Sequence, residues 1–176
     1  MFAVAMPRGN GKTALCVAAS MWAVLCGYHE FVMIIGASET AAKKNLNTIK
    51  TQLETNQLLA ADFPEVCYPI QKLERIPQRR LIYDGSPVRM TFVDGAIILP
   101  DITRRPVEPF KEPGRPKKGV PPEVIKVVPN KSASACIGVA GITGNIRGRN
   151  VARPDGKLSR PSFVLVDDPQ TDESAK

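Results

Sequence analysis

The chain has 176 residues, a formal net charge of +7 and 43% hydrophobic residues, which together predict one globular domain with a core of ordinary size. Its four cysteines never form a Cys-x-x-Cys pair and its single histidine, His29, stands alone. These features argue against a zinc site and a disulfide framework and favour reduced thiols. The apolar stretch 13–26 is too short to span a bilayer, and no targeting segment is recognisable.

The N-terminal region predicts a strand, a glycine turn and a helix. The apolar run at 2–5 is expected to be a short strand, and 12–26 is expected to be a helix that Gly27 ends. The intervening stretch contains Gly-Lys-Thr, the end of the phosphate-binding signature, but Met6 stands where its first glycine belongs. From these letters alone, a phosphate-binding loop and an ordinary loop that contains Gly-Lys-Thr by accident are equally good interpretations.

A phosphate-binding loop needs backbone N–H groups that converge on an anion at the N-terminus of a helix. Gly9 and Gly11 permit the backbone angles of such a loop. In this interpretation Lys12 would lie against the β- and γ-phosphates of a nucleotide, and the Thr13 hydroxyl would bind Mg²⁺.

The following segments alternate between strand and helix. The continuous apolar run at 31–38 is typical of a buried parallel strand. Ser38 is expected to cap the next helix, whose buried face would carry Ala42, Leu46, Ile49 and Leu53.

Further strands are predicted in the second half of the chain. Asp-Gly turns separate three strand candidates and predict an antiparallel meander, formed by 80–83, 87–93 and 96–100. Another strand is expected at 135–141. The pattern therefore predicts an α/β fold in which the meander is appended to a mainly parallel sheet.

A basic, proline-rich segment occupies 104–131. It holds eight Lys or Arg residues, three acids and seven prolines, and the prolines exclude a helix or a central strand. We expect an extended insertion whose charge either contacts a nucleic-acid backbone or keeps a linker soluble, and the sequence favours neither role.

The apolar run at 162–166 leads directly into two aspartates. A nucleotide hydrolase needs a carboxylate at the end of a core strand to hold Mg²⁺, a role that fits Asp167. It also needs a group that orients the attacking water, a role that fits Asp168. Alone, Asp-Asp-Pro more often marks a turn, but together with the loop at 9–13 it favours a nucleotide hydrolase.

The chain resembles the N-terminal ATPase domain of bacteriophage terminase large subunits, the motors that package viral DNA into a procapsid. The family's variant loop, Arg-x-x-Gly-Lys-Ser/Thr, is similar to residues 8–13. The stretches GITGNIRGRN at 141–150 and VLVDDPQ at 164–170 add to the resemblance. It implies a P-loop NTPase fold of the additional-strand type, with helices flanking a mainly parallel central sheet.

The resemblance also implies roles for individual residues. Arg8 would reach the γ-phosphate and join Lys12 and Asp168 as a catalytic residue, although it could instead form a salt bridge that fixes the loop. The nucleotide-binding set would be Arg8, Gly9, Asn10, Gly11, Lys12 and Thr13, and the metal set Thr13 and Asp167. The candidates for coupling or DNA contact are Arg147, Arg149, Lys117 and Lys118, and the two arginines could equally be exposed to solvent.

The implied cofactors are ATP and Mg²⁺. The implied partners are double-stranded DNA, a portal protein, a small terminase subunit and further copies in a ring, with no membrane. The implied location is the host bacterial cytoplasm, transiently at the procapsid portal.

The sequence departs from the family in three respects. Asp168 stands where many relatives have Glu, no adenine-contacting segment precedes the loop, and the nuclease domain is absent. We therefore expect 1–176 to be a partial P-loop ATPase domain. A helicase-like DNA-dependent ATPase, a P-loop small-molecule kinase and an inactive prophage remnant are the alternatives.

Overall fold

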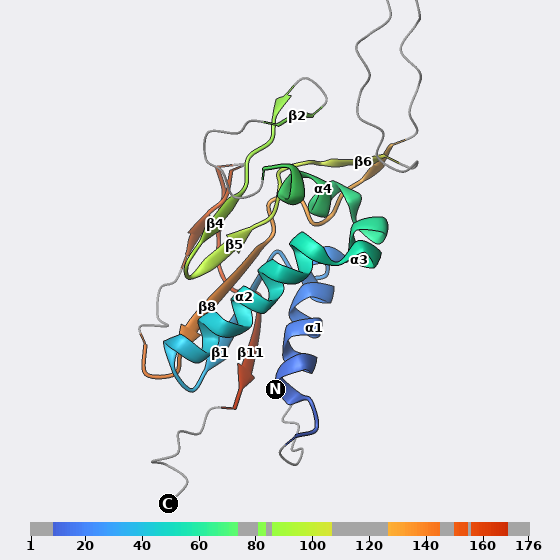
Figure 1. Cartoon of the computed structure of the whole chain (residues 1–176). Coiled ribbons are helices and arrows are strands. Elements are labelled where there is room, and N and C mark those ends of the chain that lie inside the picture. The colour runs from blue at the N-terminus through green and yellow to red at the C-terminus, as the bar shows by residue number, and fades with distance from the viewer. Residues whose placement is uncertain are drawn as a thin grey trace, which may run out of the picture.

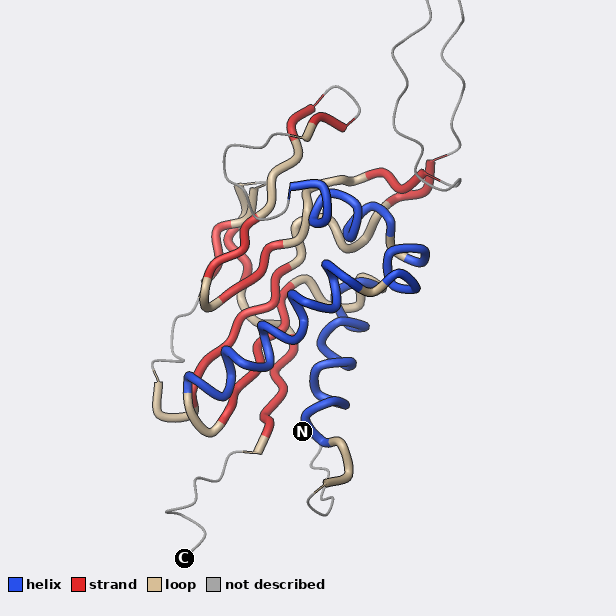
Figure 2. The backbone as a smooth tube through the Cα atoms, in the orientation of Figure 1, coloured by secondary structure: helices blue, strands red, loops and turns tan. Residues whose placement is uncertain are grey.

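The computed structural model describes residues 9–73, 81–83, 86–106, 127–144, 150–154 and 156–168. The fold is α/β, with a mixed central sheet of five strands flanked by helices (Figure 1, Figure 2). The predicted strand at 2–5 and the middle of the basic segment lie outside the described residues.

The helices and strands follow one another along the chain as the coloured ribbon of Figure 1 shows. The helices are α1 (Lys12–Leu25), α2 (Glu39–Thr55), α3 (Gln57–Asp62) and α4 (Pro64–Leu73). The central sheet contains β1 (Phe31–Gly36), β4 (Thr91–Val93), β5 (Ala96–Ile98), β8 (Cys136–Gly141) and β11 (Phe163–Asp167). Short two-stranded ladders outside it join β2 (Ile82–Tyr83) to β3 (Ser86–Pro87), β6 (Arg104–Pro106) to β7 (Val127–Pro129), and β9 (Val151–Ala152) to β10 (Leu158–Ser159).

The strand order of the central sheet is β11-β1-β8-β5-β4. Strand β1 pairs in parallel with β11 on one side and with β8 on the other. Gly36 lies opposite both Asp167 and Gly141, so the carboxyl ends of the three parallel strands finish in one row. This row is the edge of the sheet at which the predicted site residues would have to meet.

The central sheet is mixed rather than mainly parallel as predicted. The antiparallel pairings predicted for the meander do form, between β2 and β3 and between β4 and β5, but not within one continuous sheet. Only the β4–β5 hairpin joins the sheet, where β5 runs antiparallel to β8. The predicted strand 87–93 is divided, since β3 ends at Pro87, which has no backbone N–H to donate. The Arg89 N–H then donates to the Asp101 side chain at 2.8 Å instead of to a neighbouring strand.

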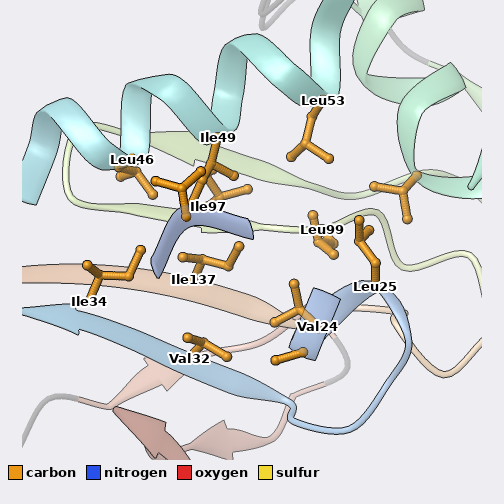
Figure 3. Packing of buried hydrophobic residues seen from close by; sticks show 14 of the residues in the cluster. Val24, Leu25, Val32, Ile34, Leu46, Ile49, Leu53, Ile97, Leu99 and Ile137 are labelled. Atoms are coloured by element: carbon orange, nitrogen blue, oxygen red, sulfur yellow. The ribbon is translucent and has the colours of Figure 1, made fainter. Parts of the chain in front are cut away.

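One hydrophobic core joins the helices to the sheet (Figure 3). The predicted buried face of α2 is confirmed, since Ala42, Leu46, Ile49 and Leu53 are all buried in this core. Alternate strand residues such as Val32, Ile34 and Ile137 face them, as expected from the period of a strand. On the opposite face of the sheet a smaller core contains Phe31, Met33 and Cys136, among others, with Val151 packed against it.

The predicted extent of the first helix, to within one residue, and the predicted start of the second are also confirmed. Helix α1 ends one residue before the predicted position, and Gly27 follows with a φ of 71°. A side chain there would also collide with Lys131, whose Cβ would lie 2.1 Å from the new Cβ atom. Ser38 caps α2, as predicted, by accepting a hydrogen bond from the Ala41 N–H at 3.1 Å. None of the described helices is long and apolar enough to cross a membrane.

Candidate functional site

Thr13 and Asp167 meet at the carboxyl edge of the parallel strands. Thr13 lies in the first turn of α1, and Asp167 is the last residue of β11. The Thr13 Oγ1 donates a hydrogen bond to Asp167 Oδ1 at 3.2 Å, although 154 positions separate the two residues. Helix α1 packs against β1 and β11, which brings its N-terminal end to this edge (Figure 1). The two sequence signals are therefore adjacent in the structure.

The Asp167 carboxylate has a second protein partner. Asn45 Nδ2 on α2 donates to Asp167 Oδ2 at 2.9 Å. Asn45 is 7% exposed and Asp167 is 8% exposed, so this hydrogen bond is buried. Asn45 was not among the predicted site residues, and its available signal was a polar residue beside Leu46 on the otherwise mainly apolar face of α2.

The N-terminus of α1 has a backbone suited to an anion. Gly11 is its N-cap, with φ 72° and ψ 22°, and within the described residues no side chain caps this helix. Gly9 also has a positive φ, 86°, and a Cβ atom at either glycine would meet no atom within 4 Å. Glycine is therefore favoured at these two positions because the backbone is left-handed there, and not because a side chain would be crowded. The uncapped N–H groups of the first turn can donate to a bound anion.

The other predicted residues of the loop and the strand end are chain neighbours of Gly11, Thr13 and Asp167. Lys12 is the first residue of α1 and is half-buried, and Asn10 is exposed in the preceding turn. Asp168 follows β11 directly, is exposed, and has a φ of 42°. Asp tolerates left-handed backbone better than most residues do, and such strained positions concentrate at functional sites.

Cys16, one turn beyond Thr13, also interacts with Asp167. Burial raises the pKa of the Cys16 thiol, and the negative charge of Asp167 and a side-chain hydrogen bond with it raise this pKa further. At neutral pH the thiol is therefore protonated. No sequence motif identified Cys16, because its relation to Asp167 depends on how α1 packs on β11.

The oxygen atoms of Thr13 and Asp167 are donors of the kind that Mg²⁺ prefers. Across the described residues, no group of three or more His, Cys, Asp or Glu side chains could hold a metal ion. A Mg²⁺ ion at this position would therefore need phosphate oxygens and water as its remaining ligands, which is usual for magnesium in nucleotide sites.

Several predicted residues are not placed with the site. Arg8, Arg147 and Arg149 lie outside the described residues, as do Lys117 and Lys118. A separate cavity of about 290 Å³ contains none of the predicted site residues. It is lined by Tyr83, Ser86, Pro87, Val88, Asp101, Ile102, Thr103 and Arg104.

Comparison with known proteins returns no match to this chain. No family model matches the sequence, and neither curated proteins nor solved structures give a significant match. The geometry at the carboxyl edge of the parallel strands is therefore the structural basis for a functional proposal.

Proposed function

We propose that this chain is a P-loop ATPase that binds ATP with Mg²⁺, in the manner of the motor domain of a phage terminase large subunit. The single observation that carries the proposal is the hydrogen bond between Thr13 and Asp167 at the uncapped start of α1. A hydroxyl and a carboxylate at this spacing can both face one cation, while the adjacent helix N-terminus faces the anion that the cation neutralises.

Binding of a phosphate and binding of a cation depend on each other at this site, because both would lie close to the Asp167 carboxylate. A phosphate bound at the start of α1 would lie close to the negatively charged, largely buried Asp167. Two like charges in such a position repel strongly because the protein screens them less than water does. The site therefore favours an anion that arrives with a divalent cation, as ATP does with Mg²⁺.

Each predicted residue has a role in this proposal. The backbone N–H groups of 9–13 and the Lys12 ammonium would bind the β- and γ-phosphates, and Arg8 would contact the γ-phosphate. Asp168 would orient the attacking water and accept its proton. Magnesium, when bound through Thr13 and Asp167, supplies positive charge that offsets the charge developing on the phosphate oxygens.

The proposed coupling to double-stranded DNA rests on sequence. The basic segment 104–131 carries much of the net charge of +7, and clustered Lys and Arg bind the phosphate backbone by releasing counterions. Lys117, Lys118, Arg147 and Arg149 are the proposed contacts. The portal protein, the small terminase subunit, a ring of copies and a location in the host cytoplasm belong to the same proposal and derive from the resemblance.

Replacing the loop lysine tests the nucleotide part of the proposal. Lys12→Ala should weaken Mg²⁺-ATP binding by about 10- to 100-fold, because hydrogen bonds to charged groups contribute about 1.5–3 kcal/mol. Titration calorimetry on the 176-residue chain measures this affinity. Lys44→Ala is the matched control, since it removes an exposed lysine from α2 and should change nothing. Equal affinity in Lys12→Ala and the parent would contradict the proposal.

A further inference from the structure

We propose that Asn45 is a positioning residue of the candidate site, whose side-chain amide holds the Asp167 carboxylate in the orientation that faces Thr13. The inference rests on the proposed function and adds to it a residue that no motif contains. Asn45 would act on bound nucleotide only through Asp167.

The carboxylate of Asp167 is held from two helices at once. Its Oδ1 accepts from Thr13 on α1 at 3.2 Å, and its Oδ2 accepts from Asn45 on α2 at 2.9 Å. One hydrogen bond would leave the carboxylate able to rotate about its Cβ–Cγ bond. Two donors on opposite oxygens fix that rotation, and so fix the direction in which the remaining lone pairs point.

Packing alone does not account for an asparagine at this position. The buried face of α2 is otherwise mainly apolar, and an apolar residue of similar size would fill the space without desolvating an amide. Lys50, the other polar residue buried on this helix, also has a specific partner. Its Nζ donates to the Val93 carbonyl oxygen at 2.8 Å. The partner of Asn45 is a carboxylate, and hydrogen bonds to charged groups are the stronger kind.

Helix α2 presents the amide from a fixed position. Ser38 caps its first turn, and Lys43 forms ion pairs with Glu39 at 3.0 Å and with Asp94 in the β4–β5 turn at 2.6 Å. The side chains of Leu46 and Ile49 anchor the same helix in the main core. A donor on such an element restrains its acceptor, whereas a donor on a loose loop would move with it.

This arrangement predicts a selective effect on metal-dependent binding. The phosphates would contact the loop and the start of α1, whereas the cation would contact Asp167, to which Asn45 donates. Loss of the outer partner of a metal-binding group typically weakens metal affinity by about 10- to 100-fold. Asn45→Leu should therefore reduce the gain in ATP affinity that Mg²⁺ provides by about that factor, and leave the affinity for ATP in EDTA unchanged.

The experiment measures ATP binding by calorimetry with Mg²⁺ and with EDTA, in the parent and in Asn45→Leu. Asn47→Leu is the matched control, because Asn47 lies on the exposed side of the same helix. Asn45→Ala serves in the same comparison if the larger side chain prevents folding. A Mg²⁺-dependent gain equal to that of the parent would overturn the inference.

A double-mutant cycle tests whether the effect passes through Asp167. The double variant Asn45→Leu with Asp167→Asn should bind Mg²⁺-ATP no more weakly than Asp167→Asn alone. Losses that add would show that Asn45 acts by another route and would overturn the inference. If the parent itself shows no Mg²⁺-dependent gain, the proposed function fails and the inference fails with it; if only the variant comparison fails, the proposed function stands.

Discussion

Helices α1 and α2 both begin near the carboxyl ends of parallel strands, but their N-termini are built differently. Ser38 caps α2 with its side chain, and Glu39 places a negative charge in the first turn. Helix α1 has Gly11 as its N-cap, and among the described residues no side chain caps it by a hydrogen bond and no acid lies in its first turn. One helix start has a side-chain cap and an acid in its first turn, and the described part of the chain supplies neither to the other.

This difference costs stability at α1. A side-chain cap is worth about 1 kcal/mol and an acid in the first turn typically about 0.3–1 kcal/mol, so α1 lacks two contributions that α2 has. The glycines before α1 also have left-handed backbone, which other residues adopt at a cost. The helix without these contributions is the one whose first turn contacts Asp167. The start of α2 is therefore built for stability, whereas we propose that the start of α1 binds phosphate.

The largest effect is expected from Gly11→Ala. The φ of 72° at Gly11 would cost alanine about 1–2 kcal/mol of stability, and relief of that strain would turn the loop N–H groups away from the phosphate. We therefore expect both a lower urea midpoint and weaker Mg²⁺-ATP binding. Gly156→Ala is the control, because Gly156 has a φ of 80° in open space and should lose stability without losing affinity. Equal changes of affinity in both variants would contradict a special role for the α1 start.

The sequence predicted the elements whose periodicity is long and regular. Strands β1, β8 and β11 and helices α1 and α2 lie where the apolar patterns placed them. Helix α4 was missed because Pro64 and Pro69 suggest breaks, although Pro64 opens the helix, where proline is tolerated. The pairing of β5 with β8 was also missed, because it joins segments about 40 positions apart and depends on tertiary packing.

The candidate site was predictable only where it has a motif. The letters Gly-Lys-Thr and Asp-Asp identified Thr13 and Asp167, and the order of the strands explains why the two residues meet. Asn45 and Cys16 have no motif around them, and their relation to Asp167 depends on which faces of α2 and α1 turn toward β11. Contacts of this kind are set by packing between elements, which local sequence does not encode.

A smaller effect is expected from Ser38→Ala at the start of α2. Loss of the hydrogen bond from the Ala41 N–H should destabilise the chain by about 1 kcal/mol, within a usual range of about 0.5–2 kcal/mol. Urea unfolding measures the loss, and Ser38→Asp should restore the stability because aspartate is an equally good cap. Mg²⁺-ATP affinity should not change. A loss of affinity as large as that of Gly11→Ala would mean that the two helix starts are not functionally distinct.

The smallest effect is expected from Asp94→Asn, which removes the ion pair that ties α2 to the β4–β5 turn. A hydrogen bond from Lys43 and its positive charge hold the pKa of Asp94 below the ordinary value of 3.8. A carboxyl group with a lowered pKa stabilises the folded chain above its ordinary pKa, and this contribution is lost as the pH falls through the lowered value. The same contacts raise the pKa of Lys43 above 10.5, so the contribution is also lost when strong alkali deprotonates the lysine.

The difference in urea midpoint between the parent and Asp94→Asn should therefore be present at pH 7 and should vanish in acid, below the ordinary range of a carboxyl group. Because both side chains reach solvent, the difference should also shrink as salt is added. A difference that is constant across pH and salt would show that Asp94 contributes to stability through the conformation of its turn with Gly95 and not through its charge. In that outcome the ion pair between Lys43 and Asp94 would contribute nothing measurable to the stability of the α2 start, and the Ser38 cap and the Lys43–Glu39 pair would remain as its local contacts.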